Sequence, residues 1–174
     1  MRPQAHVASG LLVWSLSDAP LGEAPLDVLG ANLPDFDRAV AKRLGVSGRR
    51  HHVWPSHSAL LWALTTIAAL RTGRLARPMA LVWIHLVLDT YADGIVWLWP
   101  AHREKIGLFR KPPEIHDDGW NTPAPLSTEL GKIELAMWTV AAASALRRLA
   151  GSAAGRAGSS RSPRRRRRPL LAAR

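Results

Sequence analysis

The 174-residue chain contains no cysteine, which excludes disulfide bonds, thiolate metal ligands and cysteine nucleophiles. Any metal ion must therefore be held by imidazole and carboxylate groups, as zinc, manganese and iron can be. A secretory signal pattern is also missing, because the first apolar run, residues 11–14, is short and no small-residue cleavage site follows it.

Long hydrophobic runs are scarce as well. The longest uninterrupted apolar stretches are residues 59–70 and 135–146, and a membrane-spanning helix needs about 20 residues. Joining the runs within residues 79–100 would place His85, Asp89 and Asp93 in hydrocarbon, which is costly for ionisable groups. We therefore expect buried core helices rather than membrane spans.

Acidic residues are missing from the C-terminal end of the chain, and most of the net charge of +11 comes from arginines there. Residues 151–174 contain eight arginines and no acid, so residues 1–150 carry only +3. The end of the chain is rich in Gly, Ser, Ala and Arg and has no apolar period. We predict one domain over residues 1–150, long enough for a hydrophobic core, and a disordered Arg-rich tail over residues 151–174.

The apolar spacing within residues 1–150 predicts an all-α fold, a single compact helical domain with a metal site between helices. Ser56 is expected to cap the fourth helix, and Asp35 or Asp37 to cap the third. The expected helices cover residues 5–16, 24–31, 57–71, 78–93 and 127–149, and the third, which begins after its cap, continues through residues 40–44.

His85 and Asp89 form the sharpest local signal. A spacing of four residues places both side chains on one face of a helix, about one turn apart, where they can bind one cation. Their neighbours are apolar, and a buried charge is costly unless it is paired or bound to metal. The alternative is a hydrogen-bonded His–Asp pair within the core.

The other candidate ligands lie at the starts of helices. Asp35 and Asp37 are two residues apart after a proline, an arrangement that suits divalent ions but also helix capping. His52 and His57 flank Pro55 and Ser56, and a surface loop with an ordinary capping neighbour would explain them too. His6 lies on an apolar helix, where a histidine is often a satisfied core residue. The coincidence of so many donors favours one metal site, comprising His6, Asp35, Asp37, His52, His57, His85 and Asp89.

Four motifs in this order resemble the YdjM-like membrane-associated metal-dependent hydrolases. They are His6, Leu33-Pro-Asp-Phe-Asp37, His52-Val-Trp-Pro-Ser-His57-Ser58, and His85-x-x-x-Asp89 followed by Trp97-Leu-Trp-Pro100. The resemblance covers about residues 5–100. It departs from the family pattern at Val53-Trp54, where Arg-Gly is usual, and at Ser56, where Thr is usual.

The resemblance also implies a distant relationship to zinc-dependent phospholipase C and the single-strand-specific zinc nucleases. By that analogy His6, Asp35, His57, His85 and Asp89 would be ligands, with Asp89 bridging two ions. Asp93, His116 and Glu134 are candidates for further ligands. We expect one or two divalent ions, zinc in the first place and manganese as an alternative.

The predicted function is hydrolysis of a phosphoester, a phospholipid or nucleic acid, by metal-activated water. Asp35 or Asp37 would orient that water or accept its proton. Arg49 and Arg50 could attract phosphate, although a solvated basic loop explains them equally well.

Two other functions remain open. One is a non-catalytic membrane-associated protein with a structural metal site, which closed ligation would favour. The other is a non-specific nucleic-acid binder acting through the Arg-rich tail. The tail and Trp54, Trp97 and Trp99 suggest attachment to an anionic membrane surface. We expect a cytoplasmic protein, or one bound peripherally at the inner face of the cell membrane, and infer no specific protein partner.

Overall fold

The computed structural model describes residues 2–45, 54–72, 75–92, 94–108 and 126–159. This part of the chain forms an all-α fold without a β-strand, as the sequence predicts. Its α-helices are α1 (Pro3–Leu16), α2 (Ala24–Asn32), α3 (Phe36–Arg43), α4 (Ala59–Thr72), α5 (Ala76–Ala92) and α6 (Glu129–Ser159). Short 3₁₀ turns precede three of them: η1 (Leu21–Glu23), η2 (Leu33–Asp35) and η4 (Pro55–His57).

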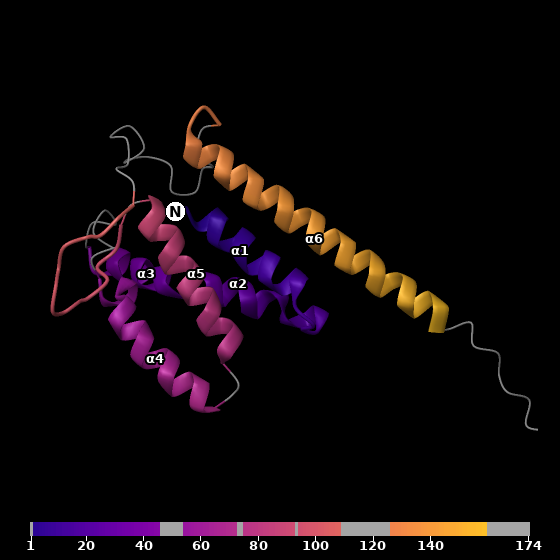
Figure 1. Cartoon of the computed structure of the whole chain (residues 1–174), viewed down its shortest axis with the longest axis horizontal. Helices are drawn as coiled ribbons and strands as arrows, with labels where there is room; N and C mark the ends of the chain where they lie inside the picture. The colour runs from indigo at the N-terminus through magenta and orange to yellow at the C-terminus, as the bar shows by residue number, and fades with distance from the viewer. Residues whose placement is uncertain (1, 46–53, 73–74, 93, 109–125, 160–174) are drawn as a thin grey trace, which may run out of the picture.

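Helix α5 is the centre of the arrangement (Figure 1). It packs against α4 on one side and against α2 and α1 on the other, while α6 lies along α1. One core cluster joins α4 to α5 through Ala59, Ala69, Val82 and Leu86. A second cluster packs side chains of α5 and α6 around Ala5. Both clusters hold α5 firmly, so residues on its inner face have fixed neighbours.

Helices α1 and α2 approach closely at Gly10. A Cβ atom at this position would lie 2.8 Å from the Val28 Cα and 2.9 Å from the Asp27 carbonyl oxygen. Only glycine permits this backbone contact. The close approach brings α1, and with it His6, against the elements that carry the other candidate ligands.

Two local expectations are corrected. Ser56 does not cap α4, because the chain turns through η4 before the helix begins at Ala59. The Ser58 hydroxyl instead accepts a hydrogen bond from the Leu61 amide at 3.4 Å. This position fits a cap because Ser58 has an extended backbone and directly precedes the helix.

The last helix continues beyond the expected end at Leu149 to Ser159. Alanines at 150, 153, 154 and 157 favour the helix and offset the glycines between them. The predicted disordered tail therefore begins with helical residues 151–159, and residues 160–174 lie outside the described part of the chain. In the described ranges, no helix combines the length and hydropathy needed to cross a membrane.

Candidate metal centre

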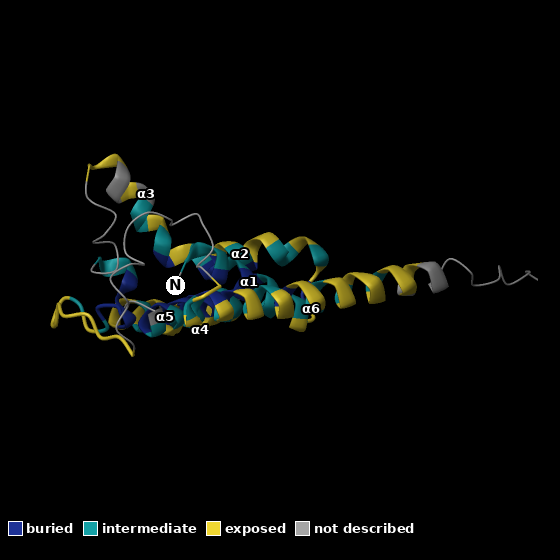
Figure 2. Ribbon diagram, turned by 90° about the horizontal axis from the view of Figure 1, so that it is seen from above, coloured by how far each residue is buried: buried dark blue, intermediate teal, exposed yellow. Residues whose placement is uncertain are grey.

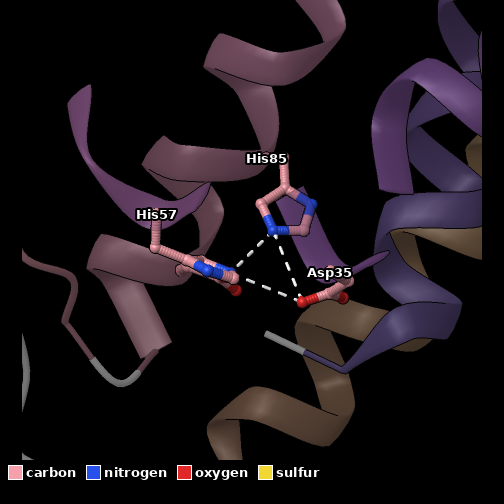
Figure 3. A group of neighbouring side chains, drawn as sticks. Asp35, His57 and His85 are labelled. Carbon is pink, nitrogen blue, oxygen red and sulfur yellow. Dashed lines mark ion pairs between the residues drawn. The ribbon is translucent and has the colours of Figure 1, made fainter. Parts of the chain in front are cut away.

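Four side chains from three elements converge beside α5. Asp35 comes from η2, His57 from η4, and His85 and Asp89 from the inner face of α5. Each offers one ligand atom, and these four atoms lie within 4.8 Å of one another. Figure 3 shows His57, His85 and Asp35 pointing toward a common centre.

The imidazole of His85 is held in one orientation. Its Nδ1 lies 2.7 Å from the carbonyl oxygen of Ala31. A carbonyl can only accept, so Nδ1 must donate, and in the neutral ring the lone pair then belongs to Nε2. That Nε2 is buried, lies 3.1 Å from Asp89 Oδ2, and has no hydrogen-bond partner among the described residues.

The imidazole of His57 is oriented by a relay on its other side. The Ser56 hydroxyl donates to Asp37 Oδ2, and the same hydroxyl oxygen lies 3.2 Å from His57 Nδ1. Because its proton is given to Asp37, this oxygen accepts from Nδ1. The Nε2 atom then faces Asp35 Oδ1 at 3.4 Å and Asp89 Oδ2 at 3.5 Å.

The centre is buried and rich in negative charge. His57, His85 and Asp89 are fully buried and Asp35 is partly buried. Burial lowers the pKa of His57, but hydrogen bonds to Asp35, Asp37 and Asp89 outweigh this effect and raise the pKa to about 10. Without another cation, a proton on His57 therefore balances part of the carboxylate charge. A divalent ion could take the place of that proton.

His6 supports the centre from α1. Its Nε2 lies 3.2 Å from Asp89 Oδ1, on the carboxylate oxygen that does not face His57 and His85. Its ring stacks on His85, with centroids 3.7 Å apart and an interplanar angle of 19°. Burial, and then the neighbouring His85, lower the pKa of His6 to about 4. The structure thus brings His6 to the edge of the four-donor group rather than into it.

The remaining predicted site residues lie in different places. Asp37 contacts His57 on the Nδ1 side, at 3.5 Å, behind the four-donor group. His52 lies outside the described residues, as do Asp93 and His116. Glu134 is buried in α6, where its Oε1 accepts a hydrogen bond from the Arg2 amide at 3.4 Å.

Three contributors were missed from the sequence. The Ala31 carbonyl orients His85 across 54 residues of chain, and no side-chain pattern reports a backbone acceptor. The Ser56 hydroxyl was assigned to helix capping. The third is Arg38 on α3, which lies near Asp35 and Asp37. Its pKa is lowered, because burial outweighs the opposing effect of these two carboxylate charges. Its position directly after Asp37 in the sequence could have identified Arg38 as a residue near the site.

Trp97, one of the three tryptophans named for membrane attachment, is half-buried and packs against the α4–α5 core. Trp54 and Trp99 are half-buried.

Comparison with known protein families gives a match over most of the chain. The model of the YdjM inner membrane protein family matches residues 1–153. No curated protein and no solved structure matches the chain, so the relationship to zinc phospholipase C and the zinc nucleases stays a prediction. The family match includes every element that carries the four-donor group. On this evidence the chain belongs to the YdjM inner membrane protein family.

Proposed function

We propose that this chain is a metal-dependent hydrolase whose metal is held by Asp35, His57, His85 and Asp89. The observation that carries the proposal is the pairing of His85 Nε2 with Asp89 Oδ2 at 3.1 Å. Both atoms are acceptors when His85 is neutral, and two buried acceptors at this distance repel. A cation between them removes the repulsion.

The donor set suits a borderline divalent ion. Two imidazole nitrogens and two carboxylate oxygens are ligands that zinc accepts in tetrahedral sites and that manganese also tolerates. We propose zinc, with manganese as an alternative, and one or two ions. When bound, such an ion supplies Lewis acidity, which polarises a phosphoryl oxygen and lowers the pKa of water.

The protein's own residues would position the reactants. Asp35 is the only partly buried member of the donor group, so substrate would approach from its side. Its carboxylate can accept a proton from the attacking water. Asp37 would act through His57, by holding the ring through the Ser56 hydroxyl.

A phosphoester is the proposed substrate class. The family resemblance favours it, and so does the guanidinium of Arg38, on which the charges of Asp35 and Asp37 act. A guanidinium offers paired donors that match phosphate oxygens. Arg49 and Arg50, the basic residues named from the sequence, lie outside the described residues.

A structural metal site is the second candidate. Four protein donors are enough to complete a tetrahedral zinc site, and the group contains four. In that case no position is left for water, and the ion would only stabilise the junction of η2, η4 and α5.

Elemental analysis followed by activity assays separates the two functions. We expect the purified chain to contain zinc or manganese and to hydrolyse at least one of three probes: phosphatidylcholine, single-stranded DNA or an aryl phosphate. Activity should disappear on chelation and return with zinc. A metal-loaded protein that is inert on all three probes would favour the structural site, and a protein that binds no divalent ion would exclude both candidates.

A further inference from the structure

Helix α4 exposes large apolar side chains along its outer face. Leu64 and Ile67 are 61% and 54% exposed. Leu60 and Leu61 extend the same face, and Ala59 and Ala69 fill the opposite face toward α5. Residues 59–70 contain no charged residue. A helix on the surface of a soluble protein normally presents a polar outer face, and α4 does not.

Helix α6 repeats this pattern. Leu135 and Leu146 are 53% and 67% exposed, and residues 135–146 contain no charge. The opposite face of the helix packs through Ile133 and Met137 into the cluster around Ala5. Its outer face is therefore apolar and uncovered within the described part of the chain.

Helix α5 continues the apolar surface between them. Val87 is 54% exposed, and rotation by 100° per residue places it on the face opposite His85 and Asp89. A helix with its side chains is about 10 Å thick. Val87 and the candidate metal centre therefore lie on opposite sides of the same helix.

Figure 2 shows α4, α5 and α6 in one layer and α2 and α3 in another. We call the exposed apolar side chains of the first layer the apolar belt: Leu60, Leu61, Leu64, Ile67, Val87, Leu135 and Leu146. Exposed apolar surfaces of this extent mark sites of interaction. Leu26 and Leu29, which are exposed too, belong to α2 and therefore to the other layer.

Charge at the ends of the two outer helices indicates what covers the belt. The uncharged run of α4 is followed by Arg71, and that of α6 by Arg147, and both side chains are exposed. The two helices run in the same direction in Figure 1, so both arginines follow the same end of the runs.

We infer that the apolar belt contacts the acyl chains of an anionic lipid bilayer, with Arg71 and Arg147 at the level of the headgroups. Apolar side chains bordered by arginine are typical of such surfaces. The family description places its members in the inner membrane but assigns no surface to the lipid. The inference is independent of the hydrolase proposal, because none of the belt residues belongs to the metal centre.

Paired leucine substitutions test this inference. The full chain should bind vesicles of phosphatidylcholine with a minority of phosphatidylglycerol. Leu61→Gln with Leu64→Gln should weaken partitioning by about tenfold or more, because both apolar side chains are lost from the contact. Leu26→Gln with Leu29→Gln is the matched control on α2 and should partition like the wild type. Reversal of these two results, or a wild type that does not bind, would overturn the inference.

A single label gives a second readout. Because the chain has no cysteine, Leu64→Cys carries one environment-sensitive dye at a unique position. Brominated acyl chains should quench this dye but not one placed at Leu29→Cys. Equal quenching at both positions would refute the assignment. A second copy of the chain as the occupant would instead appear in light scattering, as a vesicle-free dimer that Leu61→Gln with Leu64→Gln dissociates.

Discussion

His85 Nε2 lies 3.1 Å from Asp89 Oδ2, one helical turn along α5, while the other ring nitrogen of His85 contacts the Ala31 carbonyl oxygen at 2.7 Å. The pair is thus fixed at both ends, by the helix and by a backbone oxygen. An imidazole held in this way presents its lone pair to an acidic, buried point, the arrangement that a cation stabilises.

Replacing either partner should therefore remove the metal. We expect His85→Ala and Asp89→Ala each to lose bound ion and to lower the free energy of unfolding by about 1–3 kcal/mol, because a buried partner is left without its counterpart. Elemental analysis and urea unfolding measure the two effects. His102→Ala is the control, since His102 is 52% exposed and lies 4.0 Å from Glu104. Full metal content in both α5 variants would contradict the proposed ligands.

The relay behind His57 should tune metal affinity. We expect Ser56→Ala and Asp37→Asn each to weaken zinc binding by about 10- to 100-fold, because the ring loses the partners that orient its Nε2. Competition with a chromogenic chelator measures the affinity. Ser15→Ala is the matched serine control, because the Ser15 hydroxyl donates to the Leu12 carbonyl within its own helix α1. If the control loses as much affinity as Ser56→Ala, the relay has no specific role.

The metal-free protein should become less stable as the pH rises. The pKa of His57 is raised in the folded chain from 6.5 to about 10, so its proton binds the folded state more tightly than the unfolded state. This contribution is complete below about pH 6.5 and is lost as the pH approaches 10. Urea unfolding of the chelator-treated protein between these pH values should show the decline. His57→Gln should remove it, and a decline of the same size in that variant would assign the effect elsewhere.

Asp35→Asn tests the proposed reaction. The substitution keeps the size of the side chain and removes its charge, so turnover should fall about 10²-fold or more if Asp35 accepts the proton, with the fold retained. Circular dichroism and metal content provide the controls. Undiminished turnover would remove Asp35 from the mechanism and leave the other ligands in place.

Removing residues 160–174 should separate two modes of membrane binding. This segment holds seven arginines, and its attraction to anionic vesicles or DNA should fall steeply with added salt. The chain ending at Ser159 should lose DNA binding and keep the salt-resistant partitioning attributed to the apolar belt. Unchanged DNA binding after truncation would show that the Arg-rich segment is not responsible for it.

Local patterns were enough to predict the helical fold and to include the four donors among seven candidate ligands. His85 and Asp89 were predictable because their spacing matches one turn and residues 81–84 and 86–88 are apolar. Asp35 and His57 were predictable as acidic and imidazole groups at the starts of helices. In each case the signal lies within a few residues of chain.

The contacts that give these residues their roles could not be predicted in the same way. The Ala31 carbonyl meets His85 only through the packing of α2 on α5. Asp37 looks equivalent to Asp35 in the sequence, but the turn of η2 into α3 places it behind His57. Ser56 and Ser58 both fit a capping pattern, and the η4 turn decides between them.

The burial of the donors also determines how fast an ion could leave. His57, His85 and Asp89 are fully buried, so a chelator, like a substrate, would reach the centre from the side of Asp35. A bulky chelator should then remove the ion more slowly than a small one at the same concentration. Opening of the junction of η2 and η4 with α5 would add a second route, whose rate does not depend on the chelator concentration.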